Sequence, residues 1–208
     1  MTSPTNPGTC QLCNARASKA RMSRHLASCP ASHDPAGART DLVLLRIEAA
    51  GDPRYWMYLE ARRSATLQQL DAFLRRVWLE CCGHMSAFWV GQQEVTKRSV
   101  LGLAFGERGL RFTYDYDFGS TTSLAGQVLG SRLGSLGRPA LRLLARNDPI
   151  PWRCEMCPRP ATVVCPFCLD AGPCLFCEEH AQAHPCADEE AYLPVVNSPR
   201  MGVCAYGA

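Results

Sequence analysis

The feature that most constrains this chain is a run of cysteines and histidines near its C-terminal end. Three CxxC pairs are followed by two histidines, and the side chains are Cys154, Cys157, Cys165, Cys168, Cys174, Cys177, His180 and His184. Each CxxC turn presents two thiols to one tetrahedral metal ion, and histidines at positions i and i+4 of a helix share a face. The segment is too small to bury enough apolar surface to fold alone. We therefore expect bound metal to supply most of its stability, with the ligands divided between two sites.

A disulfide framework is the other way to use the 13 cysteines of this chain. Adjacent CxxC thiols are poor structural disulfide partners, and the first residues hold no apolar run that resembles a signal sequence. No later stretch is long enough to cross a bilayer. We therefore expect a cytoplasmic chain without membrane contact, and the predicted metal is zinc. A catalytic zinc is not expected, because four protein ligands leave no position for water.

A second cluster near the start of the chain consists of Cys10, Cys13, His25 and Cys29. This spacing is typical of a small zinc finger whose last ligand is a cysteine. A predicted helix over residues 17–27 would present the histidine to the metal. With the two C-terminal sites, the finger brings the prediction to about three zinc ions per chain.

The outer face of the predicted finger helix carries Lys19, Arg21 and Arg24. A zinc finger that binds in the major groove of DNA carries basic side chains on this face of its helix. Many single fingers bind proteins instead, and a basic helix face can also be simply exposed to solvent. One finger buries too little surface for specific DNA binding by itself. Nucleic-acid contact through these side chains is therefore an alternative to a protein partner.

The middle of the chain shows the periodicity of strands and one helix. A linker is predicted over residues 31–40, and a helix is predicted to begin at Thr66, with apolar side chains at helical spacing. The Gly-rich stretch 126–137 lacks a phosphate-binding motif, and we interpret it as a hairpin loop. The predicted strands cover residues 42–49, 55–61, 86–90, 110–116, 124–129 and 140–144.

These elements predict an α+β fold, in which one long helix packs on a central mixed or antiparallel sheet flanked by small zinc-binding modules. The first predicted domain, over residues 1–38, is the finger with its linker. The α+β domain follows over residues 39–150. A two-zinc module and tail then occupy residues 151–208.

Two groups in the central domain are candidates for catalysis. Asp115 and Asp117 lie two apart, so on a strand they share one face and can bind a cation. Cys81, Cys82 and His84 can form a thiol–imidazole pair. No third cation ligand accompanies the aspartates, so a structural role in a turn is the favoured interpretation for them. The neighbours of the two thiols are apolar, so the favoured interpretation is that these thiols are buried. No residue is assigned as catalytic, and a nucleic-acid-processing or thiol-dependent enzyme acting through these residues is the alternative function.

The central domain resembles the plasmid pRiA4b ORF-3-like domain family over residues 42–146. The resemblance rests on HMSAFW at His84–Trp89 and above all on FTYDYDFG at Phe112–Gly119. Many members continue with an acidic residue, a tryptophan and a histidine, whereas Ser and Thr residues follow here. The tail LPVVNSPRMGVC, Leu193–Cys204, also looks like zinc-bearing members. Membership implies an α+β fold and occurrence on plasmids and other mobile elements, without an established activity.

The cysteine- and histidine-rich stretch 154–184 resembles the B-box and related cross-brace zinc modules. In these modules the first and third ligand pairs share one ion, and the second and fourth pairs share the other. The resemblance implies one ligand set of Cys154, Cys157, Cys174 and Cys177. It implies a second set of Cys165, Cys168, His180 and His184, with Cys186 as a competitor for His184.

The function predicted from these features is that of a zinc-binding, non-enzymatic macromolecular recognition protein associated with plasmids or mobile elements. A protein partner is favoured over nucleic acid, because cross-brace modules mostly contact proteins and the tail is acidic. The identity of the partner and the oligomeric state are not predicted.

Overall fold

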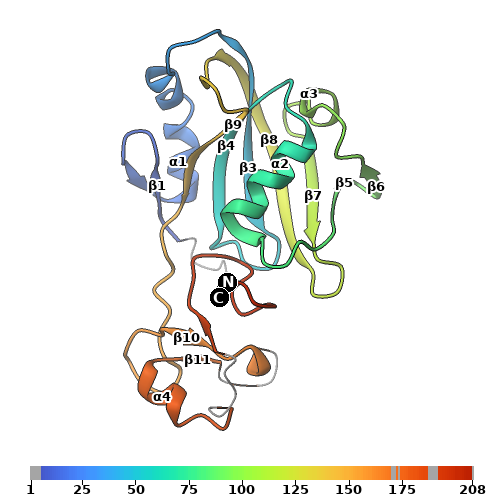
Figure 1. Ribbon diagram of the computed structural model, residues 1–208. Helices are drawn as coiled ribbons and strands as arrows, with labels where there is room; N and C mark the ends of the chain where they lie inside the picture. The colour runs from blue at the N-terminus through green and yellow to red at the C-terminus, as the bar shows by residue number, and fades with distance from the viewer. Residues whose placement is uncertain (1–5, 170–171, 173, 187–191, 208) are drawn as a thin grey trace.

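The centre of the molecule is an antiparallel sheet. The computed structural model describes residues 6–169, 172, 174–186 and 192–207. In this part of the chain nine strands pair in the order β2-β1-β9-β4-β3-β8-β7-β5-β6 (Figure 1). Their bounds are β1 Gly8–Cys10, β2 Arg16–Ala17, β3 Thr40–Ala49, β4 Trp56–Arg62, β5 Ser86–Val90, β6 Gln93–Val95, β7 Arg111–Tyr116, β8 Thr122–Gly134 and β9 Leu141–Asn147. The predicted α+β class is confirmed, and every pairing in this sheet is antiparallel.

One face of the sheet is covered by α2, Leu67–Leu74, which continues as a π-helical turn over Arg75–Leu79 (Figure 1). The helix begins at a capping box, in which the hydroxyl of Thr66 accepts the backbone N–H of Gln69 and the Gln69 side chain accepts that of Thr66. Its apolar stripe packs into the main core against the central strands. A short helix, α3 Leu101–Ala104, borders the same core. Among the described helices, none combines the length and apolar character that a membrane span requires.

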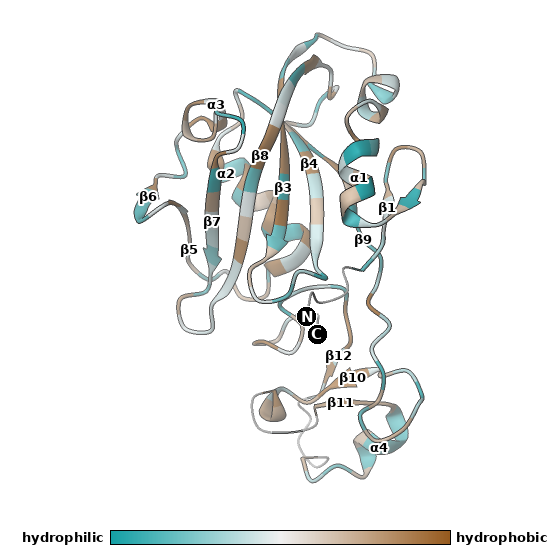
Figure 2. Cartoon of the chain, turned by 180° about the vertical axis from the view of Figure 1, so that it is seen from behind, coloured by the Kyte–Doolittle hydropathy of each residue, from teal (hydrophilic) through white to brown (hydrophobic). Residues whose placement is uncertain are grey.

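The opposite face of the sheet is partly covered by the N-terminal finger, whose helix α1 spans Lys19–His25 (Figure 2). Met22 of α1 packs with Trp56 and Tyr58 of β4, and all three residues are fully buried. Strand β4 is therefore buried on both faces, which explains the nearly unbroken apolar run that the sequence shows there. The finger also joins the sheet directly, because β1 pairs with β9.

The Gly-rich stretch 126–137 was predicted to be a hairpin loop, and that prediction is wrong for residues 126–134, which belong to strand β8. Only residues 135–137 lie in the connection between β8 and β9. Strand β8 pairs with β3 along one edge and with β7 along the other. Gly126 lies against the ring of Phe112, where a Cβ atom would clash. The glycine therefore marks a close approach of a side chain to the strand and not a turn.

The C-terminal part of the chain forms a second, smaller unit next to the sheet (Figure 1). Its three-stranded sheet has the order β11-β10-β12. Its elements are β10 Val163–Val164, the 3-10 turn Pro166–Cys168, β11 Leu175–Phe176, α4 Glu178–Gln182 and β12 Leu193–Pro194. Strands of two residues bury little apolar area, so this unit needs another source of stability.

After β12 the chain returns to the central sheet. Residues 195–207, which we call the C-terminal segment, lie at one end of the large sheet (Figure 1). The hydroxyl of Ser198 donates to the carbonyl of Trp78 at 2.6 Å, and the guanidinium of Arg146 donates to the carbonyl of Asn197 at 2.6 Å. The two units are thus joined both by the connection after β9 and by this returning segment.

Candidate metal centres

Four groups of cysteine and histidine side chains in the described residues are close enough to hold a metal ion. Within each group the candidate ligand atoms all lie within 4.8 Å of one another. The groups are Cys10, Cys13, His25 and Cys29; Cys81, Cys82, His84 and Cys204; Cys154, Cys157, Cys177 and His180; and Cys165, Cys168, His184 and Cys186. No disulfide joins any of the 13 cysteines, all of which the structure describes.

The finger group contains the four residues that the sequence predicted. Cys10 ends β1, Cys13 lies on the following turn, and His25 ends α1. The Cys13 sulfur lies 3.3 Å from His25 Nε2 and 3.7 Å from the Cys29 sulfur. Burial raises the pKa of the Cys29 thiol to about 12, so its thiolate form needs a nearby positive charge. A divalent cation among these atoms would supply that charge.

The first C-terminal group consists of Cys154, Cys157, Cys177 and His180. Cys177 is the N-cap residue of α4, and His180 lies on the first turn of that helix. His180 Nδ1 is 3.5 Å from the Cys154 sulfur and 3.3 Å from the Cys177 sulfur. The imidazole therefore points its Nδ1 atom into the cluster of thiols, as a metal ligand would.

The second C-terminal group consists of Cys165, Cys168, His184 and Cys186. Cys165 directly precedes the 3-10 turn Pro166–Cys168, and Cys168 is the last residue of that turn. The Cys168 sulfur lies 3.3 Å from His184 Nε2. Along the chain the ligand pairs of the two groups alternate. The first pair groups with the third and the second pair with the fourth, which is the order that the resemblance to cross-brace modules implies.

The membership of the two groups differs from the predicted division, and Cys174 belongs to neither. Cys174 and Cys177 flank the extended strand β11, so side chains three apart point to opposite faces. Cys174 accordingly packs against the apolar cluster that contains Val164, Leu175 and Leu193, which is separate from the cluster of the first group. His180 takes its place in the first group.

The second histidine of the predicted pair also behaves differently. α4 ends at Gln182, so His184 lies beyond the helix and does not share a face with His180. His184 instead joins the second group, and Cys186 joins it as a fourth ligand atom and does not replace it. The grouping differs from the predicted one because the chain between Cys174 and Cys177 is a strand and not a turn, and because α4 ends before His184.

The fourth group, Cys81, Cys82, His84 and Cys204, was not predicted as a metal site. Three of its members follow the π-helical turn after α2, and Cys204 lies in the C-terminal segment. The Cys82 and Cys204 sulfurs are 3.4 Å apart, and the Cys204 sulfur is 3.6 Å from His84 Nε2. The predicted burial of these thiols does not hold for Cys82, which is exposed. The CCxH spacing was the available signal, but nothing in the sequence connects it with a single distant cysteine.

Asp115 and Asp117 do not form a joint cation site. β7 ends at Tyr116, and Asp117 has a φ of 65°, so the two side chains no longer share a strand face. Asp115 accepts a hydrogen bond from the Ser123 hydroxyl at 2.6 Å. Asp117 accepts the backbone N–H of Gly119, as in a turn, and the guanidinium of Arg200 lowers the pKa of its carboxyl.

The three basic side chains of the finger helix have different environments. Lys19 forms an ion pair with Glu48 of β3 at 2.6 Å, and only 16% of its side chain is exposed. Arg21 and Arg24 are exposed. Two of the three predicted phosphate contacts are therefore accessible, whereas Lys19 holds the finger to the sheet.

The fold and these groups define the chain as an α+β protein with four Cys/His groups able to hold metal ions. No family model matches the sequence, and no match is found among curated proteins. A solved structure of a protein of unknown function from Methanosarcina mazei Go1 is similar with a TM-score of 0.42 and 13% identity, over 52% of this chain and 68% of that chain. A likeness this weak carries no information on the activity of this chain.

Proposed function

We propose that this chain is a zinc-binding, non-enzymatic recognition protein of a reducing, cytoplasmic environment, in which metal ions build the surfaces that contact a partner. The observation that carries the proposal is that each of the three groups drawn from the predicted metal-binding segments has four ligand atoms. A tetrahedral zinc ion with four protein ligands has no open position for water or substrate. Such sites stabilise structure and do not perform hydrolysis.

Zinc is the proposed metal because of the chemistry of the ligands. Every group combines thiols with one imidazole, and the groups contain no carboxylate. Sulfur and nitrogen ligands in sets of four are typical of structural zinc, while calcium and magnesium require oxygen ligands.

A protein partner is supported by exposed apolar side chains on the metal-binding turns. Met156 lies between Cys154 and Cys157, and 59% of it is exposed; Phe167 lies between Cys165 and Cys168, and 58% of it is exposed. Large apolar side chains on rigid turns are typical of protein-binding surfaces.

A nucleic-acid partner is less well supported. A finger that binds DNA presents its basic helix face to the duplex, but here Lys19 forms an ion pair with Glu48 of the sheet and is therefore not available to a phosphate. Arg21 and Arg24 alone provide a small basic surface. The resemblance of the FTYDYDFG run to the pRiA4b ORF-3-like family adds plasmids and mobile elements as the proposed biological setting.

The proposal is tested by capture from native extract of the source cells, using the full chain as bait, with and without nuclease. The variant Met156→Ser with Phe167→Ser removes the two exposed apolar side chains and leaves every candidate ligand in place. We expect a defined protein that survives nuclease treatment, binds the wild-type chain directly when purified, and binds the variant at least about tenfold more weakly.

A matched control is Leu103→Ser, which changes an exposed apolar side chain on α3, outside the metal-binding unit. This control should bind the partner as the wild type does. Capture that depends wholly on nucleic acid, or equal binding by the double variant, would contradict the proposed recognition surface.

A further inference from the structure

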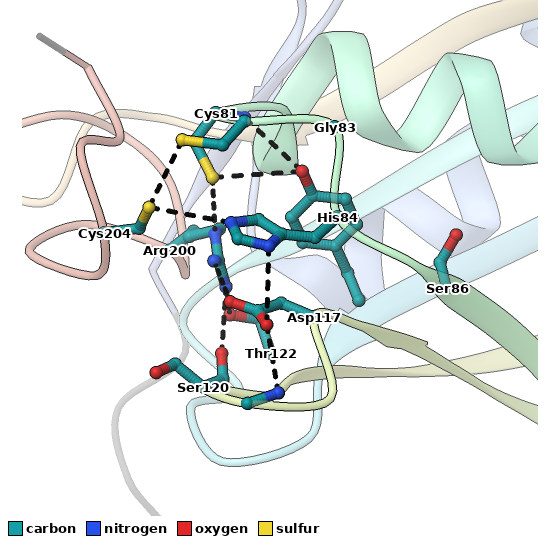
Figure 3. Close-up of polar contacts among 12 residues, drawn as sticks. Cys81, Gly83, His84, Ser86, Asp117, Ser120, Thr122, Arg200 and Cys204 are labelled. Carbon is teal, nitrogen blue, oxygen red and sulfur yellow. Dashed lines mark hydrogen bonds and ion pairs between the residues drawn. The ribbon is translucent and has the colours of Figure 1, made fainter.

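The fourth Cys/His group joins two parts of the chain that the sequence does not connect. Cys81, Cys82 and His84 belong to the connection between α2 and β5. Cys204 lies in the C-terminal segment, and Figure 3 shows it close to Cys81 and His84. The four candidate ligand atoms lie within 4.8 Å of one another. Three thiols and one imidazole are a complete tetrahedral ligand set.

His84 is oriented as a metal ligand would be. Its Nε2 atom faces the thiols, at 3.6 Å from the Cys204 sulfur. Its Nδ1 atom faces the carboxylate of Asp117, at 3.6 Å from Oδ1 (Figure 3). Histidine ligands commonly direct the nitrogen that does not bind the metal toward a carboxylate, which fixes the ring and its tautomer. Asp117, part of the FTYDYDFG run, occupies that outer position.

Arg200 completes the surroundings of the group. It is fully buried, and a buried guanidinium requires partners of opposite charge. Its Nη2 atom donates to Asp117 at 2.6 Å, and its Nη1 atom donates to the carbonyl of Ser120 and the hydroxyl of Thr122. Its Nε atom donates to the Cys81 sulfur at 3.4 Å. A thiolate is a far better acceptor for this donor than a thiol, so the contact fits a deprotonated, metal-bound Cys81.

We propose that Cys81, Cys82, His84 and Cys204 bind a fourth zinc ion, which fixes the C-terminal segment to the central sheet. The three thiols would lose their protons to solvent as the ion binds, and His84 would bind as neutral imidazole through Nε2. The proposal goes beyond the recognition function and does not depend on it.

The ion would complete a set of contacts that already hold this segment. Upstream of Cys204, Ser198 and Asn197 hydrogen-bond to the central domain, and Arg200 inserts between the sheet end and Cys81. Because the same segment follows β12 of the small unit, fixing it also restrains that unit relative to the sheet. The fourth ion therefore acts at the junction of the two units.

The first test counts metal ions in the full-length protein purified under reducing conditions. Elemental analysis should find about four zinc ions per chain. The double variant Cys82→Ser with Cys204→Ser changes two exposed side chains and should retain about three. Cys174→Ser is the matched control, since this thiol lies outside all four groups, and it should retain the wild-type number.

Cobalt replacement provides a spectroscopic test of the same site. Wild type minus double variant should give the difference spectrum of one tetrahedral cobalt ion bound by thiolates. An equal metal content in wild type and double variant would overturn the proposal. A disulfide between Cys82 and Cys204 in the reduced wild-type preparation, found by mass spectrometry, would also overturn it.

A further readout follows the C-terminal segment itself. The peptide bond after Arg200 is protected in the wild type, because that side chain is fully buried. Trypsin should cleave there at least about tenfold faster in the double variant than in Cys174→Ser. Equal cleavage rates would show that the segment is held without the ion and would refute the structural role proposed for it.

Discussion

The close packing of the finger on the sheet leads to a prediction about how its metal affects the whole molecule. We consider the variant Cys13→Ser with His25→Asn, which removes half of the finger ligands. Neither side chain is part of the buried cluster between finger and sheet. We expect the finger to lose its zinc ion and to unfold, since so small a unit has no sufficient core of its own.

The expected loss of unfolding free energy can be estimated from the side chains that the finger covers. Trp56 and Tyr58 are fully buried beneath Met22, and an aromatic side chain buries about 150 to 250 Å². If half of each ring is exposed when the finger unfolds, about 150 to 250 Å² of apolar area is lost in total, and at about 25 cal/mol per Å² the cost is about 4 to 6 kcal/mol. A domain has only about 5 to 15 kcal/mol of stability, so the sheet would become marginal.

Urea unfolding followed by far-ultraviolet circular dichroism measures this effect. For a slope of about 2 kcal/mol per M, the midpoint should fall by about 2 to 3 M. Cys174→Ser is again the control, because it makes the same thiol-to-hydroxyl change as Cys13→Ser at a thiol outside the groups. If the variant lost one zinc ion while its midpoint stayed within about 0.5 M of the control, the finger would be an independent module and the packing argument would be refuted.

Three further predictions concern other parts of the chain. Cys154→Ser should lose one zinc ion and loosen the C-terminal unit, whereas Cys174→Ser should lose none, as elemental analysis and hydrogen exchange can show. Asp34→Asn should lower the free energy of unfolding at pH 7 by about 1 to 2 kcal/mol, because a bidentate arginine lowers the pKa of Asp34 to about 2. The stabilisation by ionised Asp34 is present at pH values above the pKa that this carboxyl has in the unfolded chain, and it is lost only as the pH falls toward about 2. The difference in unfolding free energy between wild type and Asp34→Asn should therefore be constant from about pH 6 to pH 8 in urea titrations. Replacing Arg21 and Arg24 with Gln should leave metal content unchanged and reduce the log–log salt slope of any DNA binding by at most about two units, measured by fluorescence anisotropy.

The strands and the main helix were predictable because their signals are local. The capping box at Thr66 and the apolar spacing after it mark α2, and the alternation in β7 marks a half-buried strand. The finger ligands were predictable for the same reason, since Cys10, Cys13, His25 and Cys29 are close in sequence. Each of these features depends on residues that are at most 19 positions apart in the sequence.

The features that sequence reasoning missed depend on tertiary structure. The role of Gly126 is set by the ring of Phe112 on a neighbouring strand, and the position of Cys174 is set by the short strand that follows it. Cys204 is separated from Cys82 by 122 residues, so no spacing rule connects them. A CxxC motif specifies a metal-binding turn only where the chain between the thiols is not part of a sheet.

The alternation of the candidate ligands in the C-terminal unit shows how bound metal would hold this region together. Cys154 and Cys157 belong to one group, Cys165 and Cys168 belong to the other, and the chain then returns to each group in turn. Neither group can close without bringing together segments on both sides of the other group, so two ions bound there would stabilise one folded arrangement and not two separable halves. The same argument applies beyond β12 to the C-terminal segment, whose Cys204 lies beside Cys82 and His84. Trp152 packs against both the main core and one core of the small unit, so apolar contact already spans this junction, and metal bound beside Cys204 would add a second restraint on it.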